Sequence, residues 1–254
     1  MTRIILFSSH PFRRFLSALL ALGVLGLVTV GSASAQVGNP NPGVVPPAAK
    51  YRGLAYGEWQ ARFWQALLGT PVVNGVHPFL TYGAFRGADD DMVFLAPSFY
   101  YPGFSCVVEV TVPAGSPLFI PVRYNVECSQ IEAPPFYGYN EASLRKAAND
   151  WIDTYSSDYY AFIDGRPVRN IDAYRSDSPL YRFGPLPENN LFQFFGMDVP
   201  KGTTSRSVAA GCHLLLTPLS VGHHEVRVGC TGYDADPAGL VVETVFRIHV
   251  VARR

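Results

Sequence analysis

The stretch CVVEVTVPAGSPLFIPVRY, residues 106–124, carries the strongest signal of fold class. From Cys106 to Val112 every second residue is apolar, an alternation typical of a β-strand with one buried face. The segment Pro113–Gly115 breaks this pattern with turn-forming residues, and the apolar run from Leu118 to Tyr124 predicts the next strand. This part of the chain is therefore predicted to be β structure.

Further strands are predicted on either side of this stretch. Met92 to Ala96 is a short apolar run, and apolar residues alternate with polar ones from Val242 to Val250. Tyr159–Ile163 and Arg166–Arg169 flank the pair Asp164-Gly165, which accepts the positive φ angles of a two-residue turn. These two segments are predicted to form a tight β-hairpin.

Two segments have helical spacing instead. In the first, which stops at Gly69, the apolar positions are Tyr56, Trp59, Phe63 and Leu67. The second begins at Asn140, whose side chain can cap free backbone N–H groups, and its apolar positions are Leu144, Ala148, Trp151 and Tyr155. Each segment is predicted to be a helix with one buried face.

Two helices, about eight strands and no regular strand–helix alternation predict a mainly β fold. The expected architecture is a single antiparallel β-sandwich, Ig-like or jelly-roll-like, over residues 51–254, with one or two packed α-helices. The composition does not change after residue 50 in a way that would indicate a second domain.

Residues 1–35 have the pattern of a secretory signal peptide. Arg3, Arg13 and Arg14 precede an apolar run, and the small residues 33–35 form a cleavage site. The Pro-rich residues 36–50 are expected to be an extended lead-in. The mature chain, with 17 basic and 20 acidic side chains, is expected to be secreted or periplasmic, without a membrane span and without a nucleic-acid partner.

The four cysteines are predicted to form disulfides, because their number is even and the chain is predicted to be exported. Four cysteines allow three connectivities. The two local pairs, Cys106 with Cys128 and Cys212 with Cys230, are favoured because each spans a predicted hairpin. A zinc site is not predicted, because neither C-x-x-C nor a paired histidine spacing accompanies the cysteines.

The candidate catalytic residues are two carboxylates, Glu58 and Glu127, each in a segment rich in aromatic residues. Two acids about 5–9.5 Å apart can hydrolyse a glycosidic bond. Glu58 is also well placed to cap its own helix or to bind a buried arginine, and this structural interpretation is favoured.

Metal binding has weaker support in the sequence. The run Asp89–Asp91 offers oxygen ligands for calcium, but it lacks the spacing of an EF-hand loop, and a solvated acidic turn is favoured. His213, His223 and His224 fall on the hairpin predicted for residues 212–230. Its register separates His213 from His224, so no metal site is predicted.

Two Pro- and Gly-framed segments are candidate binding loops because they are rich in aromatic residues. Their candidate binding residues are Tyr100, Tyr101, Phe136, Tyr137 and Tyr139. Each loop could instead fold back over the end of the sandwich, an interpretation that is equally favoured.

Several motifs follow one another in a fixed order, among them YGEW at residues 56–59, VPAG at 112–115, NVECS at 125–129, IDGRPV at 163–168 and LPENN at 186–190. With this order and spacing, the chain resembles a family of uncharacterised bacterial secreted proteins over roughly residues 54–250. The chain departs from the family's aromatic or Trp-containing stretch at residues 211–213, and it has Phe63-Trp64 where the family has two tryptophans. The resemblance implies no activity.

The leading functional hypothesis is a non-enzymatic exported protein that binds a carbohydrate, a surface polymer or another protein through its aromatic loops. An extracellular, glycosidase-like hydrolase with paired carboxylates is the first alternative, and a structural envelope component is the second.

Overall fold

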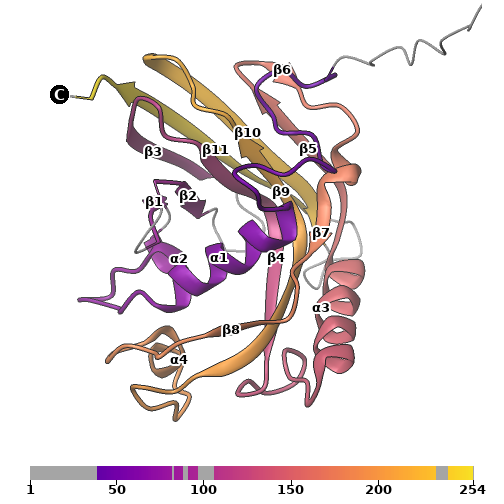
Figure 1. Cartoon of the computed structure of the whole chain (residues 1–254), viewed down its shortest axis with the longest axis vertical. Helices are drawn as coiled ribbons and strands as arrows, with labels where there is room; N and C mark the ends of the chain where they lie inside the picture. The colour runs from indigo at the N-terminus through magenta and orange to yellow at the C-terminus, as the bar shows by residue number, and fades with distance from the viewer. Residues whose placement is uncertain (1–38, 82, 88–90, 97–105, 233–239, 254) are drawn as a thin grey trace, which may run out of the picture. The chain divides into compact units, whose positions relative to one another are not determined.

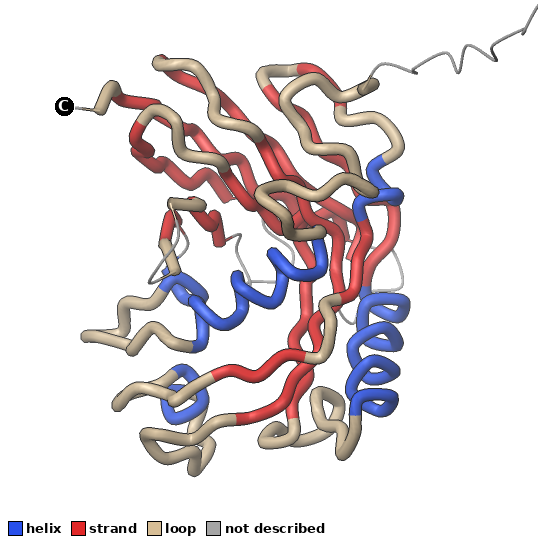
Figure 2. The backbone as a smooth tube through the Cα atoms, in the orientation of Figure 1, coloured by secondary structure: helices blue, strands red, loops and turns tan. Residues whose placement is uncertain are grey.

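Two β-sheets pack around a shared hydrophobic core (Figures 1 and 2). This computed structural model describes residues 39–81, 83–87, 91–96, 106–232 and 240–253. Cys106–Pro113 forms strand β3, in which Val108, Val110 and Val112 are buried and the residues between them are exposed. The alternation in the sequence thus predicted both this strand and its buried face.

The first sheet has six strands, in the order β1-β2-β4-β9-β7, and β8 also pairs with β9. Their bounds are β1 Gly83–Phe85, β2 Val93–Ala96, β4 Leu118–Ser129, β7 Arg175–Asp177, β8 Tyr181–Phe183 and β9 Ser205–Leu216. Every residue of β9 except Arg206 is buried, because other elements cover both of its faces.

The second sheet has five strands in the order β3-β11-β10-β5-β6. Their remaining bounds are β5 Ser156–Ile163, β6 Arg166–Pro167, β10 Gly222–Gly232 and β11 Leu240–Val251. The predicted hairpin is confirmed, because β5 and β6 pair around Asp164 and Gly165, which have φ angles of 49° and 75°.

The prediction of a single antiparallel sandwich is wrong, because both sheets are mixed. β2 runs parallel to β4, and β3 runs parallel to β11 along its whole length. The physical reason is that neither parallel pair is joined by a short turn. Strand β3 pairs with the last strand of the chain, and local sequence patterns contain no signal for such a distant partner.

The predicted hairpin over residues 212–230 is also wrong. Strand β9 ends at Leu216 and pairs with β4, β7 and β8, whereas β10 begins at Gly222 and pairs with β5 and β11. The connection between them therefore crosses from one sheet to the other instead of closing a ladder. The small or apolar residues 207–212 and 214–216 of β9 reflect burial on both faces.

No disulfide forms among Cys106, Cys128, Cys212 and Cys230, all of which lie in the described part of the chain. This corrects both predicted pairs. In each pair the two cysteines belong to strands of different sheets, so neither pair is held together by a hairpin. Cys106 lies 3.6 Å from Thr244 Oγ1, and Cys212 lies 3.5 Å from the carbonyl oxygen of Ile171.

Two longer helices cover the six-stranded sheet, and both were predicted. They are α1, Tyr56–Leu68, and α3, Glu141–Tyr155. The short helices are α2, Pro78–Thr81, α4, Leu191–Phe194, and the 3-10 turn η1, Ile171–Tyr174. Helix α1 buries Trp59, Phe63 and Leu67 in the main core, whereas α3 buries Leu144, Ala148 and Ile152 in a second cluster with Val208 and Ala210 of β9.

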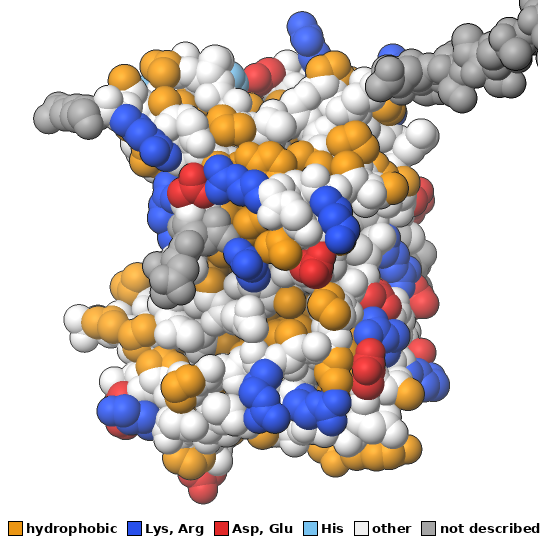
Figure 3. Space-filling model, viewed as in Figure 1, with side chains coloured by type: hydrophobic (Ala, Val, Ile, Leu, Met, Phe, Trp, Pro, Cys, Tyr) orange, Lys and Arg blue, Asp and Glu red, His pale blue; other side chains and the backbone are white. Residues whose placement is uncertain are grey.

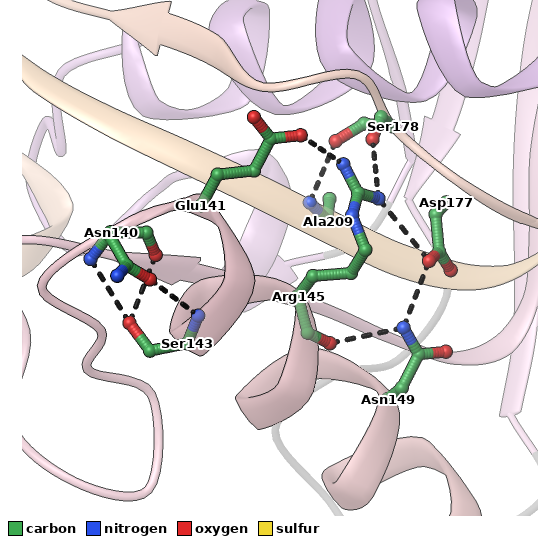
Figure 4. A network of polar contacts seen from close by, with 8 residues as sticks. All are labelled: Asn140, Glu141, Ser143, Arg145, Asn149, Asp177, Ser178 and Ala209. Atoms are coloured by element: carbon green, nitrogen blue, oxygen red, sulfur yellow. Dashed lines mark hydrogen bonds and ion pairs between the residues drawn. The ribbon is translucent and has the colours of Figure 1, made fainter.

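A polar network attaches α3 to the end of β7 (Figure 4). Arg145 donates hydrogen bonds to Glu141, Asp177 and the carbonyl oxygen of Ser178, at 2.8, 3.3 and 3.1 Å. Asn149 donates to the same oxygen of Asp177 at 2.9 Å. Acidic and basic side chains also alternate along the edge of the molecule where α3 lies (Figure 3). The exposed side of α3 is thus occupied by ion pairs.

Replacing Asn140 by Ala is expected to destabilise the protein by about 1 kcal/mol. The Asn140 side chain accepts a hydrogen bond from Ser143 N at 2.9 Å, and Ser143 Oγ accepts one from Asn140 N at 3.0 Å. Chemical denaturation measures the change. Asn140→Asp is the matched control, because a carboxylate keeps the cap. An equal loss in both variants would contradict a capping role.

The described part of the Pro-rich lead-in is packed against the domain. Val44 and Val45 are buried, Val44 pairs with Leu216, and Asn41 donates a hydrogen bond to the carbonyl oxygen of Arg169 at 2.9 Å. In the described residues, no helix is both long and apolar enough to cross a membrane.

Candidate functional site: a partly aromatic cavity with a carboxyl pair

A cavity of about 380 Å³ lies at the edge of β4. Strand β2 pairs with β4 only at Leu118 and Phe119. Beyond them, between Ile120 and Cys128, β9 is the only strand that pairs with β4 within the described residues. The consecutive residues Tyr124–Glu127 line the cavity. Because neighbouring residues of a strand point to opposite faces, the cavity reaches around this strand edge.

Seven of the fourteen residues that line the cavity are aromatic. On one side Trp151 of α3 contacts Tyr124 and Phe136, with ring centroids 5.5 and 5.8 Å apart. On the other side Phe79 and Phe195 meet edge to face at 6.0 Å. The wall is completed by Trp64, Leu68, Leu191, Phe192 and Met197. The cavity therefore offers flat apolar surfaces to a ligand.

Two carboxyl groups, Glu127 and Glu132, face this apolar wall. Glu127 is 5% exposed. Glu132 accepts a hydrogen bond from Ser129 Oγ at 2.9 Å. Burial raises the pKa of Glu132 to about 7. Burial also raises the pKa of Glu127 well above its usual value, and the neighbouring charge of Glu132 adds to the effect. The two groups titrate as a pair, which holds a proton at pH values where an exposed glutamate is ionised.

The hydroxyl group of Ser207 contacts the carboxyl group of Glu127. Ser207 Oγ lies within hydrogen-bond distance of a Glu127 carboxyl oxygen and of the Cys128 carbonyl oxygen, the latter at 3.0 Å. A hydroxyl group has one proton and can donate it to only one of them. The bond that Ser207 donates to Glu127 favours the ionised carboxylate, so it opposes the effect of burial on the pKa of Glu127 without cancelling it.

Next to the carboxyl pair, Asn125 has unused hydrogen-bonding capacity. Its Oδ1 accepts hydrogen bonds from Trp64 Nε1 at 3.0 Å and from Gln60 Nε2 at 3.4 Å. Within the described residues, its buried Nδ2 has no acceptor, and Gln60 Oε1 has no donor. Buried polar groups are normally paired, so Asn125 Nδ2 is a natural partner for a ligand acceptor.

The structure separates the two predicted catalytic residues. The carboxylate of Glu58 accepts a hydrogen bond from Ala55 N at 2.8 Å at the start of α1, and Glu58 does not line the cavity. Glu127 meets Glu132 instead. Sequence reasoning missed Glu132, which lies in a Pro-rich connection after β4. The available signal was a second carboxylate five residues after Glu127.

The predicted binding residues have different positions. Phe136 lines the cavity, whereas Tyr137 and Tyr139 are 43% and 72% exposed. Tyr100 and Tyr101 lie outside the described residues. Of the predicted binding loops, therefore, one aromatic side chain is placed in the cavity wall.

The acidic run Asp89–Asp91, considered above as a possible source of calcium ligands, is described only in part. Asp89 and Asp90 lie outside the described residues, and Asp91 forms an ion pair with Arg52. In the described ranges no group of three His, Cys, Asp or Glu side chains is arranged to hold a metal ion. Calcium binding stays the less favoured interpretation of this acidic run, and the described residues do not test it.

Comparisons with known proteins find distant structural similarity only. No protein-family model matches the chain, and no curated protein matches it. Among solved structures, a chain in the structure of PbICP-C in complex with falcipain-2 has 10% identity and a TM-score of 0.21, and the match covers 58% of this chain and 90% of that one. The cysteine protease inhibitor EhICP2 from Entamoeba histolytica has 11% identity and a TM-score of 0.19, with 58% and 97% covered. At these TM-scores the likeness does not establish a shared fold, and the family resemblance of the sequence stays a prediction.

Proposed function

We propose that this protein is a binding protein for a carbohydrate or a similar polyhydroxylated ring, which it holds in the cavity at the edge of β4. One observation carries the proposal: a carboxyl pair, Glu127 and Glu132, lies in a cavity whose remaining lining is mostly aromatic, with some aliphatic residues and Asn125. Sugar rings present an apolar C–H face and a rim of hydroxyl groups. The aromatic walls match the face, and the carboxyl groups match the hydroxyl groups.

The polar groups of the cavity complement such a ligand. An ionised carboxylate accepts hydrogen bonds from two hydroxyl groups, and a protonated one both donates and accepts. Asn125 Nδ2 supplies a further donor, and binding would give this buried group the acceptor that it lacks in the described residues. The cavity volume of about 380 Å³ is within the range of small-molecule sites.

Replacing Phe136 by Ala is expected to weaken ligand binding roughly tenfold, because the variant loses one aromatic wall. A glycan array with the purified chain identifies the ligand, and isothermal titration calorimetry then gives the affinity. Tyr139→Ala is the matched control, because Tyr139 lies three residues away in the same loop, is 72% exposed and does not line the cavity. Retention of no glycan, or equal affinities for Phe136→Ala and Tyr139→Ala, would count against the proposal.

A hydrolase is the second candidate, and the pKa of Glu132 favours it. A general acid works best when its pKa is near the working pH, and burial raises the pKa of Glu132 to about 7. Glu127 is in hydrogen-bond contact with Glu132, closer than the about 5–9.5 Å that separates the two acids of a glycosidase, so it would share a proton with Glu132 and not act as a separate nucleophile or base. Chromatography of a bound glycan after incubation distinguishes the two functions. An intact glycan supports binding alone, whereas new reducing ends that disappear in Glu132→Gln support hydrolysis.

A further inference from the structure

A pair of histidines stands on the outer face of the five-stranded sheet, remote in sequence from the cavity residues. His223 of β10 and His249 of β11 are direct partners in the antiparallel ladder. Their rings stack with centroids 4.4 Å apart and planes 10° from parallel. Both side chains are exposed, and neither ring makes a hydrogen bond to another described residue.

We propose that His223 and His249 form a surface site for a divalent transition-metal ion that prefers imidazole, such as Zn²⁺ or Cu²⁺. Neutral imidazole is a common ligand of both ions. Zinc–nitrogen bonds are about 2.0–2.1 Å long, so one ion spans two imidazole nitrogens that lie about 3.4 Å apart at a tetrahedral angle. Because the lone pair of an imidazole nitrogen lies in the ring plane, the two rings must leave their stacked arrangement and tilt toward a common ion, and exposed side chains are free to rotate in this way. Water fills the remaining coordination positions.

The surroundings of the histidine pair favour a cation. The surface depression that contains both rings is also lined by Glu109, Asp164 and Glu225, with Arg247 as the only lysine or arginine. Glu109 lies 3.7 Å from Arg247, and Glu225 lies 3.4 Å from Arg227, a residue outside the depression. The lining therefore has a net negative charge, which raises the local concentration of metal ions.

The neighbouring His224 has a different role and provides a matched control. Its Nδ1 lies 2.8 Å from an Asp164 carboxylate oxygen, and its Nε2 lies 3.0 Å from the Ser220 carbonyl oxygen. Both nitrogens already have partners, so His224 is not available as a ligand. His224 lines the same depression as His223 and His249, so its replacement separates ligation by the pair from a general effect of a nearby imidazole.

Isothermal titration of ZnCl₂ into the tag-free full chain tests the site. We expect one zinc ion per chain, and a loss of affinity of roughly tenfold or more in both His223→Asn and His249→Asn, because removal of a direct ligand should cost at least as much as removal of its supporting partners. His224→Asn should bind zinc like the wild type. With Cu²⁺, electron paramagnetic resonance should give the signature of two nitrogen ligands, and each single variant should lose one of them.

Three results would overturn the proposal. The first is no zinc binding at millimolar concentration, and the second is unchanged affinity in the double variant His223→Asn/His249→Asn. The third is an equal loss of affinity in His224→Asn. Far-UV circular dichroism of each variant checks that the sheet is intact, and the exposure of both rings makes unfolding unexpected.

Discussion

Glu132→Gln is expected to stabilise the protein at pH 8 and to leave its stability nearly unchanged at pH 4.5. The pKa of Glu132 is about 7 in the folded protein, against a usual value of 4.5. At pH values between these two pKa values, the folded state holds a proton that the unfolded state has released, so stability falls as the pH rises. The difference between the two pKa values corresponds to a loss of about 3 kcal/mol in the free energy of unfolding above pH 7. The raised pKa of Glu127 acts in the same direction.

Urea denaturation of the wild type and of Glu132→Gln from pH 4 to pH 9 measures this effect. Glutamine keeps the size of the protonated acid and an oxygen that can accept from Ser129, so only the ionisation is removed. The control is Glu109→Gln, whose side chain is 78% exposed and which should leave the pH profile of the wild type unchanged. If the free energies of unfolding of the wild type and of Glu132→Gln depended on pH in the same way, this carboxyl group would not be held protonated.

Phe63→Ala is expected to cost about 3–5 kcal/mol of folding free energy. Phe63 is completely buried at the centre of an aromatic cluster, and its ring contacts Phe85, Phe94 and Phe119 at centroid distances of 5.3, 5.7 and 6.1 Å. The truncation leaves a cavity between α1 and the six-stranded sheet, because the surrounding rings are held by their own contacts.

Chemical denaturation of Phe63→Ala is best compared with Phe194→Ala. Both substitutions remove the same group, but Phe194 is 48% exposed, so its loss should cost less than about 1 kcal/mol. If the two variants were equally stable, α1 would not be anchored through Phe63.

The elements that were predicted from the sequence depend on local signals. The stripe from Tyr56 to Leu67 and the stop at Gly69 define α1, and the capping side chain of Asn140 defines the start of α3. The Asp164-Gly165 turn fixes the β5–β6 hairpin, because few residue pairs accept its backbone angles. In each case the residues that carry the signal are neighbours in the chain.

The features that were missed depend on residues far apart in the chain. Parallel pairing of β3 with β11 joins Cys106 to Thr244, and no short-range pattern encodes it. The choice of Glu58 as the partner of Glu127 failed for a related reason, because its helix-capping role satisfies that carboxylate locally. His249 was not considered as a partner of His223, since its pairing follows only from the register of β10 with β11.

The pairing of β3 with β11 also determines the order in which parts of the five-stranded sheet can fold. Cys106 and Thr244 are 138 residues apart, and this contact closes a loop that contains most of the domain. A nascent chain that stops before β11 exposes the edges of both β3 and β10, the two strands that β11 joins. Unpaired edges of this kind recruit other chains. The five-stranded sheet can thus be completed only after β11 has been synthesised, and until then the protein is most exposed to aggregation.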